Sequence, residues 1–224
     1  MMEEDIHQYS GEEIEVSYDV ERCIHVRECV RGLPEVFDPD KRPWIDPDNA
    51  DADELADVIT ACPTGALHFE RTDDGPTETI PDENSVTVAP DGPLYLHGDI
   101  EVTTPNDETL LADTRVALCR CGLSDNKPLC DNSHVEADFE ADSSIPKDHE
   151  GAEDVDDGGT LQVVPKPDGP VLLDGAFELH GTDDDSTVRD SDAALCRCGA
   201  SGTKPFCDGT HAEIGFSSEE GSNR

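Results

Sequence analysis

The sequence has few aromatic residues, few basic residues and no long apolar run. Aromatic residues make up 4% of the 224 residues, and the 15 Lys and Arg face 54 Asp and Glu, so the net charge is −39. This composition argues against a large hydrophobic core. No stretch approaches the roughly 20 apolar residues of a transmembrane helix, and the acidic start differs from the basic start of a signal peptide. We therefore expect a cytoplasmic protein without membrane contact.

The shortage of positive charge also restricts the partners. DNA, RNA and anionic membranes repel a strongly acidic protein, so we expect none of them to bind. Intrinsic disorder is one explanation of such acidity, but the acidic residues concentrate between patterned segments. A halophilic protein explains the composition better, because concentrated salt screens the repulsion among its carboxylates.

Nine cysteines are present, and they form three groups of three. In a cytoplasmic chain such groups indicate metal ligands before disulfides, and an odd number suits disulfides poorly. Two groups belong to a motif that occurs twice with identical spacing and ends in a histidine. Its candidate metal ligands are Cys119, Cys121, Cys130 and His134 in the first copy and Cys196, Cys198, Cys207 and His211 in the second. Thiolates with imidazole select zinc or iron-sulfur clusters.

Both copies resemble the CDGSH iron-sulfur domains, the family that includes mitoNEET. The second copy matches the whole pattern from Cys196 to His211, whereas the first has Asn132 where the second has Gly209. Asparagine tolerates a left-handed backbone better than most residues, so the loop is expected to survive this change. The resemblance implies a 2Fe-2S cluster bound by three cysteines and one histidine in each copy. It also implies pairing about a two-fold axis, which a tandem chain can make within a monomer as an internal pseudo-dimer.

Two pairs of residues near the ligands are predicted to support the clusters. Asp131 and Asp208 follow the third cysteine and are expected to cap a short helix that carries the histidine. Lys127 and Lys204 precede the third cysteine by three residues, where a cation can offset the cluster charge; ordinary surface placement is the alternative. The arginines at 120 and 197 have a weaker case for the same role.

The third group consists of Cys23, Cys29 and Cys62, and Val26 stands midway between the first two. Residues 10–70 resemble the divergent mono-cluster ferredoxins, through Val-Arg-Gly at 30–32, Lys-Arg-Pro-Trp at 41–44 and Cys-Pro-Thr-Gly-Ala-Leu at 62–67. The resemblance implies a 3Fe-4S cluster, or a 4Fe-4S cluster whose fourth iron takes His25, water or another donor. Inert buried thiols are the alternative for the cysteines, and a solvent-facing position is the alternative for His25.

Together with the pattern, the two resemblances imply an α+β protein with a small ferredoxin-like domain and two β-rich CDGSH units in a pseudo-two-fold lobe. Residues 1–9 read as a frayed tail, 10–70 as the first domain, and 71–84 and 140–161 as acidic linkers. Residues 85–139 align without a gap with 162–216, which indicates a duplicated folded unit. Each unit is expected to contain two strands joined by a Pro-Asp-Gly-Pro turn, and two separate beads on a string are the alternative arrangement. The remaining histidines, His7, His68, His97, His149 and His180, are predicted to be surface residues.

These sites predict an electron carrier, or a protein that stores and transfers clusters, with a redox protein or an apo iron-sulfur protein as its partner. A cluster with one imidazole in place of a thiolate is one unit less negative than an all-cysteine cluster, so its reduction potential should be higher. The imidazole also makes such a cluster sensitive to mild acid. A zinc-binding structural or interaction protein is the alternative, although zinc sites usually separate paired ligands by two to four residues. No base, nucleophile or substrate pocket is identifiable, so we do not expect an enzyme.

The halophilic interpretation predicts that salt stabilises the fold. We expect the melting midpoint, followed by circular dichroism, to rise between dilute buffer and molar potassium chloride, because the Debye length falls to about 3 Å. A midpoint that is the same in both solutions would contradict the interpretation.

Overall fold

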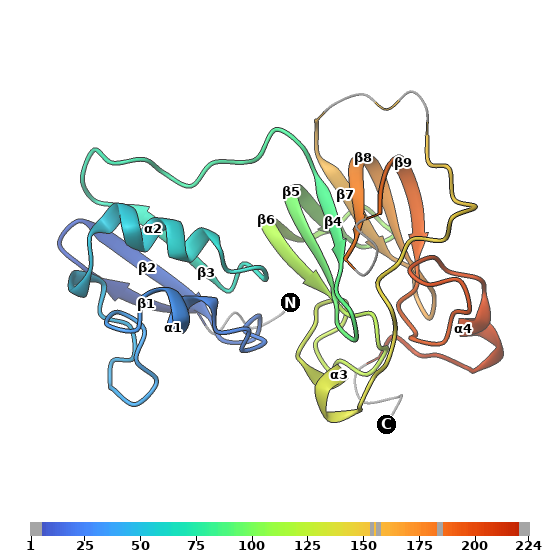
Figure 1. The fold of residues 1–224 in the computed structure, drawn as a ribbon, viewed down its shortest axis with the longest axis horizontal. Coiled ribbons are helices and arrows are strands. Elements are labelled where there is room, and N and C mark those ends of the chain that lie inside the picture. Colours follow the sequence, from blue (N-terminus) through green and yellow to red (C-terminus); the bar gives the residue numbers. More distant parts are fainter. Residues whose placement is uncertain (1–5, 153–154, 156–157, 183–185, 220–224) are drawn as a thin grey trace. The chain divides into compact units, whose positions relative to one another are not determined.

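The computed structural model describes residues 6–152, 155, 158–182 and 186–219. The chain divides into two compact units, Met1–Thr79 and Ile80–Arg224 (Figure 1). We describe each unit by itself. None of the helices within the described ranges has the length and apolar character needed to cross a membrane.

The first unit contains a three-stranded antiparallel sheet in the order β1 (Ile6–Ser10), β2 (Ile14–Asp19) and β3 (Leu67–Arg71). Its helices are α1 (Glu28–Gly32), the 3-10 helix η1 (Pro47–Asn49) and α2 (Ala52–Thr60). The expectation of a frayed tail over residues 1–9 is wrong for the described part, because each of residues 6–10 pairs with a residue of β2. Residues 1–5 lie outside the described residues.

Helix α2 forms where the sequence predicts it. The Asp51 side chain accepts a hydrogen bond from the backbone N–H of Asp53 at 3.0 Å, which confirms the predicted N-cap. Leu55 and Ile59 are one turn apart and fully buried, so they form the apolar face that packs into the core of this unit. The helix therefore ends in a fixed position just before the third cysteine of the group.

The second unit contains both copies of the repeat. The first copy forms β4 (Ser85–Val88), β5 (Leu94–Thr103), β6 (Thr109–Leu118) and α3 (Ser133–Glu136), and the second forms β7 (Leu161–Pro165), β8 (Val171–Gly181), β9 (Thr187–Leu195) and α4 (Thr210–Glu213). The two strands predicted in each copy are present. The third strands, β6 and β9, were not predicted, because their outer halves carry many polar residues and show no clean alternation.

The first strand of each copy lies between the second strands of both copies. Strand β4 pairs antiparallel with β5 and parallel with β8, and β7 pairs antiparallel with β8 and parallel with β5. Strands β5 and β8 change partner along their length, next to an irregularity between His97 and Ile100 in β5 and between Asp174 and Phe177 in β8. Neither copy therefore completes its sheet alone.

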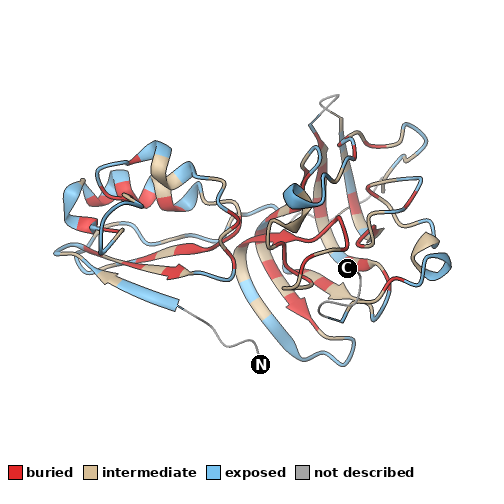
Figure 2. Cartoon of the chain, turned by 90° about the horizontal axis from the view of Figure 1, so that it is seen from below, coloured by how far each residue is buried: buried red, intermediate tan, exposed pale blue. Residues whose placement is uncertain are grey.

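Buried side chains of both copies form one hydrophobic core. Val86 and Leu96 of the first copy belong to the same cluster as Val163 and Leu173 of the second. The buried positions follow the strands, as Figure 2 shows in red. With a shared sheet and a shared core, the two copies are one compact unit and not two separate beads.

The segment 140–161, expected to be a flexible linker, is in part packed against the second unit. Its Ser143 hydroxyl bonds with that of Thr182 at 2.8 Å, and Ile145 is buried in the shared core. Further along, the N–H of Ala152 donates to the Arg189 carbonyl at 3.0 Å. Residues 153, 154, 156 and 157 lie outside the described residues. Despite its acidic composition, this part of the segment is held in place, because its few apolar and hydroxyl side chains contact the second unit. We call residues 141–152 the strap.

The buried side chain of Asn84 connects three backbone segments of the second unit. Its amide donates to the carbonyls of Gly159 and Ala176, both at 2.9 Å, and its oxygen accepts from the N–H of Asp99 at 2.8 Å. We expect Asn84→Ala to lower the free energy of unfolding by about 2–3 kcal/mol, because it leaves these groups without a partner. Urea unfolding followed by circular dichroism would measure the change. Asn106→Ala, in an exposed turn, is the control, and equal midpoints for the two variants would contradict the expectation.

Candidate metal centres

Each duplicated motif is a loop that leaves the end of a strand and returns to it. In the first copy the N–H of Cys119 donates to the Pro128 carbonyl at 2.9 Å, and the N–H of Cys130 donates to the Ala117 carbonyl at 2.9 Å. The second copy repeats both bonds at 2.7 and 2.8 Å, between Cys196 and Pro205 and between Cys207 and Ala194. The third cysteine is thus fixed beside the first two, and the short helix that follows places the histidine.

The predicted donors come together in pairs. The two Sγ atoms of each Cys-x-Cys pair are 3.7 Å apart in the first copy and 3.8 Å apart in the second. The third thiol lies 3.4 Å from Nδ1 of His134 in the first copy and 3.3 Å from Nδ1 of His211 in the second. Two donors on one tetrahedral metal with bonds of about 2.0–2.3 Å lie about 3.6–3.8 Å apart. The two thiol pairs match this spacing, and the two thiol–imidazole pairs are slightly closer.

The structure gives no convergent set for a single ion. Across the described ranges, no group of three or more His, Cys, Asp or Glu side chains is arranged to hold one metal ion. Pairs of donors are the observed arrangement in both copies.

The protonation of the thiols follows from the pairing and from burial. A hydrogen bond from Cys121 lowers the pKa of Cys119 to about 6, while the same bond and burial raise the pKa of Cys121. Burial raises the pKa of Cys130 to about 12 and lowers the pKa of His134. The pairing thus favours the thiolate form of Cys119, burial favours the neutral form of His134, and metal binding must displace the remaining thiol protons.

Asp131 and Asp208 join the helix to the ligand loop. The Asp131 carboxylate accepts from the N–H of Ser133, the first residue of α3, at 3.0 Å and from the N–H of Asp125 at 2.8 Å. Asp208 makes the equivalent bonds with Thr210 and Gly202 at 3.0 and 2.7 Å. The expected contact with the helix start is present, although the N-cap positions belong to the left-handed residues that follow, Asn132 with φ 76° and Gly209 with φ 89°.

The two matched lysines close their own loops. The Lys127 amine donates to the Ser124 carbonyl, and the Lys204 amine donates to the Ser201 carbonyl at 2.5 Å. These bonds hold the two ammonium groups within the ligand loops. A positive charge must lie there if it is to offset the negative charge of a cluster. That electrostatic role stays a prediction.

The arginine inside each Cys-x-Cys pair is buried and has a structural role. Arg120 donates to the carbonyls of Gly92 and Asp142, both at 2.9 Å, and its guanidinium carbon lies 5.5 Å from the centre of the Phe139 ring. Arg197 repeats the arrangement with Gly169 at 3.1 Å and with the Phe216 ring at 5.5 Å. The sequence analysis considered only redox tuning and missed both phenylalanines, although their recurrence in the two copies was a signal.

The two ligand loops touch each other through their main chains. Gly122 and Gly199, which follow the Cys-x-Cys pairs, have φ of 84° and 81°. A Cβ atom on Gly122 would lie 2.8 Å from the carbonyl oxygen of Cys198, and one on Gly199 would lie 2.6 Å from that of Cys121. Only glycine permits this approach. The sequence analysis missed this contact, because the residue spacing within one motif does not indicate where the other motif lies in space.

The two sites differ in exposure. Cys121 and Cys130 are buried, whereas the equivalent Cys198 and Cys207 are half-buried. At the second site His149 bonds with the buried Asp190 at 3.0 Å, and its ring lies 4.1 Å from that of Phe206, next to Cys207. His149 is therefore half-buried and paired, which differs from the predicted surface position.

In the first unit, the three remaining cysteines line one hollow. Its wall includes residues that the sequence analysis did not select, Tyr18, Trp44 and Thr64, together with His25 and Val26. Burial, followed by the charge of Cys62, raises the pKa of Cys29 to about 11, so this thiol is protonated at neutral pH until a metal displaces the proton. Three thiols facing one hollow fit a cluster with three cysteine ligands.

The loop between Cys23 and Cys29 has an unusual backbone. His25 and Arg27 have φ of 57° and 69°, a conformation that is costly for residues other than glycine and that concentrates at functional sites. Nδ1 of His25 lies 3.8 Å from Sγ of Cys23, and the ring is exposed. The histidine therefore lies beside the hollow, and its role as a fourth donor stays a prediction.

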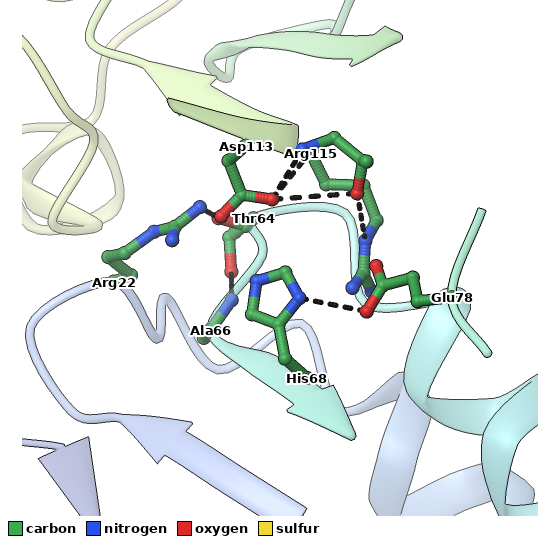
Figure 3. Close-up of polar contacts among 8 residues, drawn as sticks. Arg22, Thr64, Ala66, His68, Glu78, Asp113 and Arg115 are labelled. Atoms are coloured by element: carbon green, nitrogen blue, oxygen red, sulfur yellow. Dashed lines mark hydrogen bonds and ion pairs between the residues drawn. The ribbon is translucent and has the colours of Figure 1, made fainter. Parts of the chain in front are cut away.

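The loop after Cys62 is fixed by two contacts. The buried Arg22 donates to the Thr64 carbonyl at 2.7 Å (Figure 3), and Sγ of Cys62 lies 3.6 Å from the Thr64 hydroxyl. His68, on β3, bonds with Glu78 at 2.9 Å in the same figure. It lines a hollow without cysteines.

Two matched soft-donor sites on a strand-rich scaffold, with a third thiol group in a separate unit, define a metal-binding protein of the iron-sulfur class. Comparison with known families agrees. The family described as divergent 4Fe-4S mono-cluster matches residues 9–72, and the family described as iron-binding zinc finger CDGSH type matches residues 91–135 and 168–212. The chain therefore belongs to the tandem CDGSH iron-sulfur proteins and carries an N-terminal divergent 4Fe-4S mono-cluster domain.

Curated relatives match part of the chain. Two proteins named "Uncharacterized protein YjdI", from Escherichia coli strains K12 and O157:H7, are each 41% identical to this chain over 63 residues. The match covers 28% of this chain and 83% of each relative. No solved structure matches the chain.

Proposed function

We propose that the protein carries two 2Fe-2S clusters and one 3Fe-4S or 4Fe-4S cluster, and that it transfers electrons, or stores and transfers clusters. The observation that carries this proposal is the arrangement of the donors in two pairs in each CDGSH loop. Each iron of a 2Fe-2S cluster needs two protein ligands, and the pairs supply them at distances close to those of a tetrahedral site.

The residues of each loop have distinct roles in this proposal. In the first copy Cys119 and Cys121 would hold one iron, while Cys130 and His134 would hold the other. A cluster held in this way would supply one-electron transfer. The Lys127 ammonium group offsets part of the negative charge, and the second copy uses its equivalent residues in the same way.

The proposed cluster of the first unit is held by Cys23, Cys29 and Cys62. The three thiols are partly buried, and Tyr18 and Trp44 form part of the wall of their hollow. This position limits the access of water to a bound cluster. Low solvent exposure is one of the properties that set the potential of such a cluster.

We also propose that the two CDGSH copies are related by a pseudo-two-fold axis within a monomer. Matched strand pairs support this relation. The first strand of the first copy, β4, pairs with the second strand of the second copy, β8, and in the same way β7 of the second copy pairs with β5 of the first. The proposed partner is a redox protein or an apo iron-sulfur protein, and the proposed setting is a salt-rich cytoplasm. The protein is proposed to have no catalytic site of its own.

Zinc is the alternative metal, since three thiolates and one imidazole also suit a tetrahedral zinc site. Such a site needs all four donors around one ion. The separate pairs of the two loops favour a cluster with two irons.

Metal and sulfide analysis tests the proposed cofactors. We expect anaerobically purified protein to be coloured and to contain iron and acid-labile sulfide in nearly equal amounts. Replacing Cys23, Cys29 and Cys62 together by serine should remove only the first-unit cluster, and electron paramagnetic resonance of the native protein should identify it as 3Fe-4S or 4Fe-4S. Colourless protein that contains zinc and no sulfide would refute the proposal.

Exchange of the ligand histidines tests the electron-transfer role. We expect His134→Cys and His211→Cys each to lower the midpoint potential of the altered site, on the order of 100 mV or more, because a thiolate adds one negative charge to the cluster. Redox titration followed in the visible spectrum measures the shift. His180→Ala is the control, because its ring bonds with Thr187 and not with a cysteine. A potential that stays the same in both cysteine variants would exclude the proposed role of the imidazoles.

A further inference from the structure

We propose that the two CDGSH sites bind their clusters cooperatively, because Gly122 and Gly199 press the two ligand loops against each other. The inference rests on the proposed function, since it concerns the loading of the same two sites. The inference goes beyond the proposed function, because it makes the cluster affinity of one site depend on whether the other site is loaded.

The contact involves the ligand cysteines themselves. Cys121 precedes Gly122, Cys198 precedes Gly199, and each glycine approaches the carbonyl group of the cysteine in the other copy. A methyl group at either glycine would come within 2.6–2.8 Å of that oxygen, closer than such atoms can approach. A movement of one loop therefore displaces a ligand residue of the other.

Cooperativity follows from the cost of ordering these loops. Cluster binding must hold four donors in one geometry, and fixing a backbone costs conformational entropy. Because the loops are in contact, the first cluster orders part of the second loop as well, and the second cluster then binds at lower cost. The coupling is reciprocal, so the loss of either cluster weakens the other. The protein should pass mainly between an empty and a doubly loaded state.

Native mass spectrometry of the full chain tests this proposal. The chain used carries serine in place of Cys23, Cys29 and Cys62, because a 4Fe-4S cluster in the first unit would have the mass of two 2Fe-2S clusters. Its apo form is titrated anaerobically with iron and sulfide, and the molecules with zero, one or two 2Fe-2S clusters are counted by mass. At half-saturation, independent sites leave about half of the molecules or more with a single cluster. We expect a singly loaded fraction well below one half. A fraction of one half or more would overturn the proposal.

Two glycine variants test the contact as the cause. Gly199→Ala should raise the singly loaded fraction to one half or more, or remove both clusters while the strands remain intact by circular dichroism. Gly215→Ala is the matched control, because Gly215 also has a positive φ, 66°, and an added Cβ meets nothing within 4 Å. It should retain the native distribution. A Gly199→Ala variant that loads like the native protein would overturn the proposal.

A ligand variant decides the question even if Gly199→Ala does not fold. Cys207→Ser removes a donor of the second site and leaves all four donors of the first site in place. We expect the first site to need several-fold more iron and sulfide for half-loading, and unchanged loading would overturn the proposal. If the native protein shows no 2Fe-2S mass at all, the proposed function fails, and that result is distinct from independent loading of two clusters.

Discussion

Strand pairing between the two copies is the constraint on which the second unit depends. Strand β4 needs β8 and β7 needs β5, so each copy completes its sheet with a strand of the other. The same pairing joins the two sets of core residues. It also brings the ends of β6 and β9, where the ligand loops begin, into one compact unit. The contact between the loops is therefore a result of how the sheet is built.

Buried arginines replace part of the large apolar core that this composition cannot supply. Arg120 and Arg197 each donate to backbone carbonyls of a turn and stack on a phenylalanine. Their hydrogen bonds satisfy the buried charge, which would otherwise be costly. Few aromatic residues are present, but two of the six phenylalanines serve this purpose at matched positions. Because these arginines complete the buried region, most acidic residues can remain on the surface.

The sequence predicted local features well and contacts between distant segments poorly. Ligand spacing identified the pairs that end in His134 and His211, and the cap at Asp51 was recognised, because both depend on neighbours along the chain. The approach of Gly122 to Cys198, the pairing of His149 and the strap over residues 141–152 depend on how the copies fold together. Strand β1 was missed because its short run alternates weakly and its stability comes from pairing with β2.

Covalent duplication has a consequence that two identical subunits could not share. Each half of the lobe is encoded separately, so one half can acquire substitutions while the other stays unchanged. Asn132 and Leu129 in the first half correspond to Gly209 and Phe206 in the second, and the Phe206 ring packs against His149. A homodimer would have to accept every such change twice. A single gene can thus give its two metal centres different environments while their partner halves stay at a fixed stoichiometry.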